Sequence, residues 1–173
     1  MTPQSPLHQA LYAALDDEFK ARATYRAVID AFGPVLPFVS IIQSEQCHIE
    51  SLQNLLAARG LPAMDDPYAA GLAAPASLED AHRIGVEAEV ENVALYDRLM
   101  DAAIGDDQVL QLFSALQHAS AACHLPAFRR GLEGGQAEGC GSGHGHQHTG
   151  GHCCGGHRHR GAGGGSCGSH AAG

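Results

Sequence analysis

Basic residues are scarce in this 173-residue chain, which has 10 Lys and Arg against 19 Asp and Glu and a formal net charge of −9. Without a basic patch, nucleic acids and anionic membranes are not expected as partners, because both bind proteins largely through Lys and Arg. No stretch reaches the roughly 18 apolar residues of a membrane span. The opening MTPQSPLHQALYAALDDEF also lacks the basic start of a signal peptide. These absences predict a soluble cytoplasmic protein, in which six cysteines suggest metal or redox chemistry sooner than disulfides.

The composition changes sharply near Leu132. Residues 1–133 carry 18 of the 19 acids, whereas residues 134–173 are mostly Gly with seven His and four Cys. Glycine at this density costs too much backbone entropy to order, and the segment has no apolar surface to bury. We therefore expect one folded domain at 1–133 and a disordered Gly/His/Cys-rich tail at 134–173.

Apolar residues recur at helical spacing in four segments of the first domain, and no alternating β-branched segment predicts a sheet. Capping and turn residues place the four expected helices at 6–33, about 37–59, 77 to about 104, and 106 or 107 to about 130. Two helices joined by a short turn, a long crossover at 60–77 and two more helices are typical of a ferritin-like four-helix bundle. The fold class is therefore all-α.

The two predicted hairpins repeat each other. At an offset of 71, Glu18 and Tyr25 in the first helix match Glu89 and Tyr96 in the third. At an offset of 76, a second set in the second helix matches the fourth: Ser44, Cys47 and His48 fall on Ser120, Cys123 and His124. The chain looks like one helical hairpin duplicated, so chance is a poor explanation for the Glu45-x-x-His48 pair.

Bundle-core metal sites use one Glu from each of two helices and a Glu-x-x-His pair from each of the other two. Five residues match this pattern and are the predicted metal ligands: Glu18, Glu45, His48, Glu89 and His124. The sixth position is Ala121, which matches Glu45 in the repeat alignment. Gln117 and His118 lie one turn before it and are candidates to replace the missing Glu in part. The alternative is that the three Glu are solvated surface acids and His124 is a hydrogen-bonded core histidine.

Tyr25 and Tyr96 each lie two helical turns after a predicted ligand. Each hydroxyl is expected to hydrogen-bond a ligating carboxylate from another helix, although both rings would also serve as ordinary core aromatics. Glu87 and Glu91 lie two residues either side of Glu89, so they turn away from its face and are expected to be solvated.

The runs DDEFKARATY, SEQCHIESLQNLL, SLEDA and ASAACHLPAF resemble a rubrerythrin-related ferritin-like domain family of unassigned function, over roughly residues 7 to 132. In that family the fourth helix usually carries Ser-x-x-Asn-His, where this chain has Ser120, Cys123 and His124. The resemblance implies that the absent Glu is a family trait. It implies a ferritin-like bundle but no particular activity.

The tail CGSGHGHQHTGGHCCGGHRHR offers imidazole and thiol ligands to zinc, copper or nickel. No cysteine pair has C-x2-C spacing, which argues against a defined zinc finger, and the alternative is a linker with no selected role. The predicted tail ligands are His144, His146, His148, His152, Cys153, Cys154, His157 and His159.

Three functions are compatible with this sequence. The first is a metal-binding protein that stores, buffers or delivers metal, with one or two iron ions in the bundle and softer metals on the tail. The second is a di-iron oxidoreductase acting on Fe(II), oxygen or peroxide, and the third is a structural bundle with a degenerate site. By analogy with bundles of this size, a homodimer is compatible with the sequence.

Overall fold

The computed structural model describes residues 5–134, which form helices and connecting segments without a strand. The first three predicted helices are α1 (Pro6–Phe32), α2 (Phe38–Ala58) and α3 (Leu78–Ala102). The fourth is divided into α4 (Asp107–Ala119), a π-helical turn η1 (Ser120–His124) and α5 (Leu125–Leu132). The all-α prediction is confirmed for this part of the chain, and the predicted tail ligands lie outside the described residues.

Side chains cap three of the helix starts that the sequence predicts. Ser5, Ser77 and Asp106 each accept the backbone N–H of the third residue beyond them, which satisfies an amide that has no partner within the helix. Gly33 follows α1 with φ of 84°, a conformation that favours glycine, and the chain turns there toward α2.

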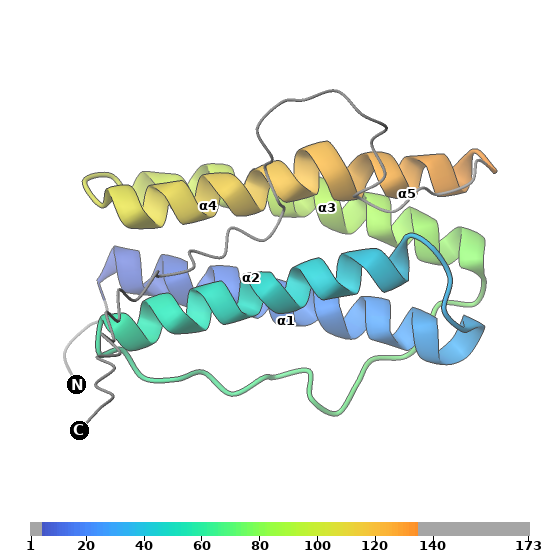
Figure 1. Cartoon of the computed structure of the whole chain (residues 1–173), viewed down its shortest axis with the longest axis horizontal. Coiled ribbons are helices and arrows are strands. Elements are labelled where there is room, and N and C mark those ends of the chain that lie inside the picture. Colours follow the sequence, from blue (N-terminus) through green and yellow to red (C-terminus); the bar gives the residue numbers. More distant parts are fainter. Residues whose placement is uncertain (1–4, 135–173) are drawn as a thin grey trace, which may run out of the picture.

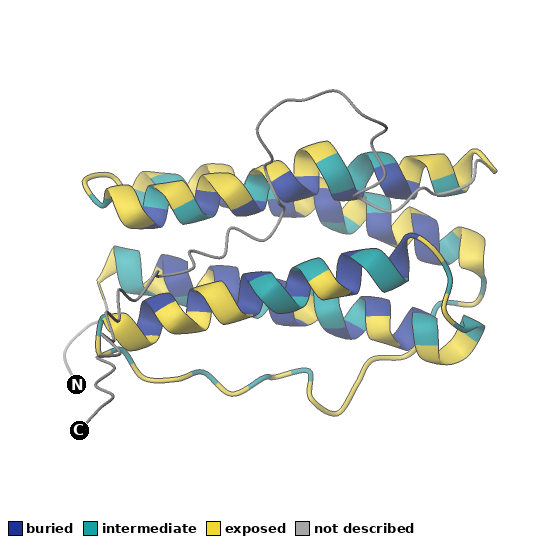
Figure 2. Ribbon diagram, viewed as in Figure 1, coloured by how far each residue is buried: buried dark blue, intermediate teal, exposed yellow. Residues whose placement is uncertain are grey.

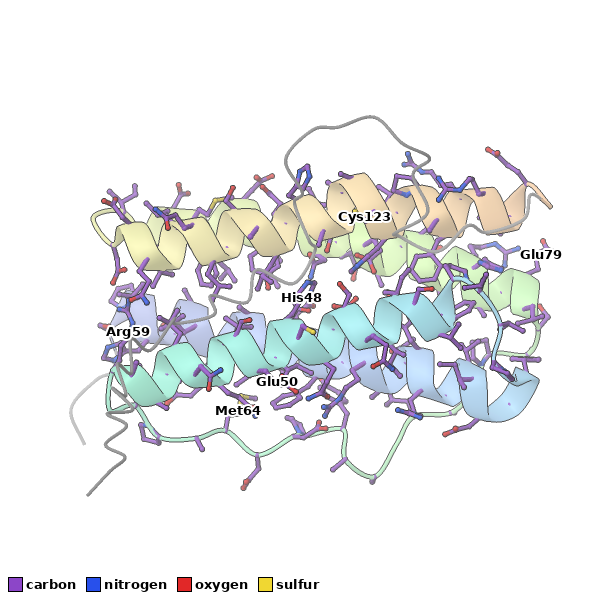
Figure 3. All side chains as sticks on the ribbon, viewed as in Figure 1. His48, Glu50, Arg59, Met64, Glu79 and Cys123 are labelled. Carbon is purple, nitrogen blue, oxygen red and sulfur yellow. The ribbon has the colours of Figure 1, made fainter. Side chains whose placement is uncertain are left out.

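The helices form two hairpins that pack against each other (Figure 1). One hairpin is α1 with α2, and the other is α3 with the α4–η1–α5 rod, so the long crossover between α2 and α3 runs the length of the bundle (Figure 1). At one end of the bundle Arg59, labelled in Figure 3, forms a bidentate ion pair with Asp106. The Nη1–Oδ2 and Nη2–Oδ1 distances are 2.6 and 3.0 Å. This bidentate pair joins the end of α2 to the start of α4.

Buried residues follow the inner stripe of each helix, and outward-facing positions are exposed (Figure 2). The apolar core is divided into two clusters, one containing Leu15, Leu52 and Phe113 and the other containing Tyr25, Phe38 and Phe128. Most of the buried polar residues, described below, lie between or next to these two clusters along the helices. Within residues 5–134, no helix is both long and apolar enough to cross a membrane.

Candidate metal centre

All five predicted ligands lie together in the interior of the bundle. They come from α1, α2, α3 and η1, each is at most 3% exposed, and His48 lies in the space between the hairpins (Figure 3). The reading of the three Glu as solvated surface acids is therefore wrong. Five buried ionisable groups in one place require partners, because an isolated buried charge costs several kcal/mol.

The first group joins α1 and α2 and contains Glu18, Glu45 and His48. His48 Nδ1 lies 2.9 Å from Glu45 Oε2 and 3.1 Å from Glu18 Oε2. Ser44 Oγ lies 3.4 Å from the other ring nitrogen, Nε2. The Nδ1 atom thus faces two carboxylate oxygens at once.

The second group contains Glu45, Glu89 and His124. His124 Nδ1 lies 3.2 Å from Glu45 Oε1 and 3.5 Å from Glu89 Oε2, yet it has no partner in hydrogen-bond geometry. The nitrogen thus lies close to two carboxylate oxygens without a hydrogen bond to either. Side chains that bind one ion together bring their donor atoms to such distances.

Glu45 belongs to both groups and uses a different oxygen in each, Oε2 toward His48 and Oε1 toward His124. The rings of His48 and His124 stack with centroids 5.9 Å apart. A carboxylate with one oxygen in each of two ligand groups is placed to bridge two ions.

The donor spacing fits metal coordination. Bonds of about 2.1 Å put neighbouring ligand atoms about 3.0 Å apart around an octahedral ion and about 3.4 Å apart around a tetrahedral one. The four nitrogen–oxygen distances in the two groups, from 2.9 to 3.5 Å, lie within about 0.1 Å of this range. The residues present therefore fit one or two cations.

Two buried tyrosines hold the outer carboxylates. Tyr96 donates to Glu18 Oε1 and Tyr25 donates to Glu89 Oε1, both at 2.6 Å. Each hydrogen bond runs from one hairpin to the other, as the sequence predicts, and leaves Oε2 of the same carboxylate in its ligand group. The two rings also pack in the apolar clusters, so both readings of these tyrosines hold.

Burial and mutual proximity shift the titration of the metal-free centre. Burial and the neighbouring Glu45 raise the pKa of Glu18 to about 8. Burial opposes a charge on His48, but Glu18 and Glu45 outweigh it and raise its pKa to about 10. Burial likewise opposes a charge on His124, whose pKa is nevertheless well above its usual range because of Glu45 and Glu89. For Glu45, burial alone would raise the pKa, but the two histidines hold it well below its ordinary value.

The π-helical turn changes the register that the repeat predicts. Leu125 N–H bonds to Ser120 C=O, five residues back, and Pro126, just beyond, has no N–H to donate to Ala122. At about 4.4 residues per turn in a π-helix, the residue three before His124 is rotated about 115° away from it, instead of about 60° in an α-helix. Ala121 is consequently exposed, so the expectation that it faces the centre is wrong.

Ser120 occupies the inward position instead and belongs to a polar chain that the sequence analysis did not identify. Its hydroxyl donates to Asn92 Oδ1 at 2.7 Å, and Asn92 Nδ2 donates to Asp17 Oδ2 at 2.6 Å. The repeat contained a signal for Ser120, because it matches Ser44, which lies beside His48. Nothing in the spacing identified Asn92 or Asp17.

The proposed substitutes for the sixth ligand do not reach the centre. His118 is exposed. Gln117 donates to Val93 C=O at 3.0 Å and to Asp97 Oδ1 at 2.6 Å on α3. Both expectations are therefore wrong, because His118 faces solvent and the side chain of Gln117 is bonded to α3.

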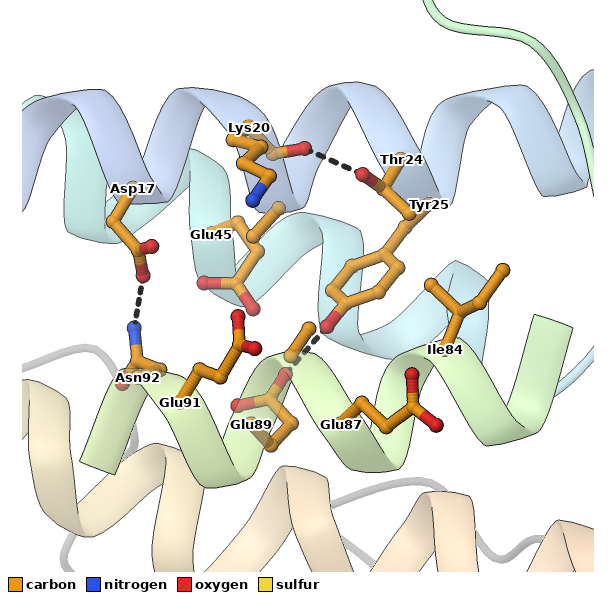
Figure 4. Close-up of a pocket in the computed structure, with 12 residues that line it drawn as sticks. Asp17, Lys20, Thr24, Tyr25, Glu45, Ile84, Glu87, Glu89, Glu91 and Asn92 are labelled. Atoms are coloured by element: carbon orange, nitrogen blue, oxygen red, sulfur yellow. Dashed lines mark hydrogen bonds between the residues drawn. The ribbon is translucent and has the colours of Figure 1, made fainter. Parts of the chain in front are cut away.

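A cavity of about 150 Å³ connects the centre with the surface between α1 and α3 (Figure 4). Its inner wall contains the buried Glu45, Glu89 and Tyr25, and its outer wall contains Glu87 and Glu91. These two acids are exposed, as predicted, but they line the same cavity as Glu89, so the expectation that they turn away from its face is wrong. The cavity therefore reaches the second ligand group.

Among solved structures, the chain is similar to the fully reduced, all-ferrous state of nigerythrin, with a TM-score of 0.64 and 20% sequence identity. The match covers 77% of this chain and 68% of that one. The fold is ferritin-like. No protein-family model and no curated protein matches the sequence. At this identity the likeness supports the rubrerythrin-related ferritin-like fold and does not determine an activity.

Proposed function

We propose that the ferritin-like bundle binds two metal ions, natively iron, with Glu45 bridging them. One ion would be held by Glu18, Glu45 and His48, and the other by Glu45, Glu89 and His124. The observation that carries the proposal is the unpartnered Nδ1 of His124, 1% exposed and within 3.5 Å of two carboxylate oxygens. Such a buried nitrogen is stabilised when a cation binds between it and the carboxylates.

Iron suits this donor set, since carboxylates favour hard cations and imidazole suits iron. The protein would then store, buffer or deliver iron. The His- and Cys-rich segment 140–160 would bind softer ions, zinc, copper or nickel, because thiolates and imidazoles favour them.

A second function is favoured by the cavity. Each ligand group contributes only three protein side chains, and the second group lies at the inner wall of a cavity that reaches solvent. Three protein ligands leave coordination positions for water or substrate. When bound, iron would supply electron transfer to oxygen or peroxide, with Tyr25 and Glu89 fixing the wall on which the small molecule binds. This would make the protein an oxidoreductase acting on Fe(II), oxygen or peroxide.

The experiment compares the tag-free full chain with Glu45→Gln and with Glu50→Gln, a matched change at an exposed position of the same helix. Anaerobic Fe(II) titration should show two ions per chain that are present in the parent and in Glu50→Gln but absent in Glu45→Gln. Ions held by the tail are common to all three proteins and cancel in the comparison. Equal iron content in the three proteins would refute the two-ion centre and leave a structural bundle.

Oxygen consumption separates the two functions. An oxidoreductase consumes oxygen or peroxide when either is supplied to the Fe(II)-loaded parent, and Glu45→Gln loses this consumption. A protein that only holds Fe(II) for storage, buffering or delivery binds the same iron without consuming either above the level of the variant.

A further inference from the structure

The cavity between α1 and α3 leads from exposed residues, past a half-buried one, to buried ones. Exposed residues form its rim, the half-buried Asp17 lies on its wall, and Glu45 and Glu89 close its inner end at 3% exposure (Figure 4). A volume of about 150 Å³ holds several water molecules, since one takes about 30 Å³ in the liquid. A partly hydrated cation therefore has room inside.

The charges along the cavity are mostly negative. Asp17, Glu87 and Glu91 are acidic, and Lys20 is the one basic side chain among the lining residues. Acids that line a cleft with low-dielectric walls concentrate cations and raise their association rate. Asp17 is held in place by Asn92, which Ser120 holds in turn, so its carboxylate is positioned on the wall.

An independent observation indicates a cation at the inner end. The unpartnered, 1%-exposed Nδ1 of His124 faces the two carboxylates that close the cavity, Glu45 at 3.2 Å and Glu89 at 3.5 Å. Of the five candidate ligands, only Glu45, which both groups share, and Glu89 line the cavity. The second group therefore has one lining side chain of its own, Glu89, whereas the first group has none.

We propose that this cavity is the access path for divalent cations, and that the group of Glu45, Glu89 and His124 is loaded through it. The negative charges of Glu87 and Glu91 attract the hydrated cation to the rim. The Asp17 carboxylate then stabilises it on the wall between the rim and the inner carboxylates of Glu45 and Glu89. The group of Glu18 and His48 fills afterwards by transfer across Glu45. The inference rests on the two-ion centre proposed above.

Loading is measured by stopped-flow tyrosine fluorescence with Mn²⁺, which prefers carboxylate and imidazole to thiolate ligands. The chain has no Trp, and all four of its Tyr precede residue 134, so the tail contributes no signal. Tyr25 and Tyr96 donate to ligand carboxylates and report occupation of the centre.

Three changes to the cavity have different expected effects. The pair Glu87→Gln with Glu91→Gln should slow association threefold to tenfold at low salt, whereas Lys20→Gln should accelerate it. Ala21→Phe places a ring in the cavity and should slow loading more than tenfold. All three should retain the stoichiometry at equilibrium. The control Asp101→Asn, an exposed acid about 15 Å along α3 from Glu91, should stay within twofold of the parent.

The outcomes are distinguishable. If the parent binds no Mn²⁺, both the two-ion centre and the access path are refuted. If the parent binds Mn²⁺ but the acid pair, Lys20→Gln and Asp101→Asn all associate at the parental rate, only the access path is refuted. The charge variants carry the test even if Ala21→Phe fails to fold, because they alter exposed side chains alone.

Discussion

Filling the centre with metal should release about three protons per chain at pH 7. Metal binds the deprotonated forms of its ligands. In the metal-free protein the pKa of Glu18 is about 8, that of His48 is about 10 and that of His124 is well above its usual range. At pH 7 Glu18 holds about 0.9 protons and His48 about one, and the carboxylates of Glu45 and Glu89 keep the His124 ring mostly protonated by raising its pKa. These protons must leave when both ligand groups are occupied.

The same side chains in water would release far fewer protons. With the ordinary pKa values of 4.5 for Glu and 6.5 for His, the three groups would hold about 0.5 protons in total at pH 7. Each displaced proton makes the apparent binding constant rise tenfold per pH unit. Complete filling of the centre should therefore strengthen about 1,000-fold per pH unit near neutrality.

The assay is a Mn²⁺ titration in weak buffer with a pH indicator. An ion bound by residues 140–160 would also release protons, so the reference is His48→Ala with His124→Ala, which retains that segment and lacks both imidazoles of the centre. The difference between the two proteins should be close to three protons. A difference below one proton would show that these residues titrate as solvated groups, and the reasoning from burial would be refuted.

Without metal, the same shifts make stability fall as pH rises. The pKa of Glu18 is raised to about 8, so its contribution to the free energy of unfolding declines between pH 4.5 and 8. The contribution of His48 to the free energy of unfolding is fully present below pH 6.5 and is lost as the pH rises through 10. Urea unfolding of metal-free protein should show lower stability at pH 9 than at pH 6. Saturating Mn²⁺ should reverse this order, because metal competes with protons for the folded state, and an unchanged order would contradict the linkage.

Three substitutions test other parts of the structure. Tyr96→Phe removes the 2.6 Å hydrogen bond to Glu18. It should lower the free energy of unfolding in urea by about 1–3 kcal/mol and weaken Mn²⁺ binding about tenfold or more. Parental values for both would contradict the role of Tyr96 in holding the Glu18 carboxylate. Ala121→Glu should change stability by less than about 0.5 kcal/mol and leave Mn²⁺ stoichiometry unaltered, because this position is exposed; added metal-dependent stabilisation would refute the π-helical register. Gly131→Ala places a methyl group into the ring of His82 and should cost about 1–3 kcal/mol, and a neutral result would show that the ring moves freely.

The sequence predicted most of the bundle because its signals are local. Ser5, Ser77 and Asp106 mark helix starts through hydrogen bonds that span three residues, and the apolar stripes follow from helical periodicity. The convergence of the five candidate ligands was predictable for another reason. A duplicated hairpin with the same residues at matching positions constrains the three-dimensional arrangement as well as the spacing.

The register of the last helix was not predictable by the same route. An alignment of repeats compares positions by counting residues. The direction in which a side chain leaves the helix depends instead on how far the helix rotates per residue. The π-helical turn changes that rotation between Ser120 and His124, and only the packing of η1 against α3 shows which residue faces inward. Pro126 was a visible sign of a disturbed helix, but its position alone does not distinguish a bend from a π-helical turn.

The missing sixth carboxylate and the cavity lie on the same side of the centre. Ser120 takes the inward position of the absent Glu and donates to Asn92, and Asn92 lines the cavity together with Asp17. A fourth buried carboxylate would add charge that the two histidines cannot balance in the metal-free protein. The neutral Ser120–Asn92 pair instead satisfies its hydrogen bonds without a metal. It follows that the side of the centre on which the repeat lacks a carboxylate is also the side with a path to solvent, the arrangement that exchange of a bound ion and binding of a small molecule both require.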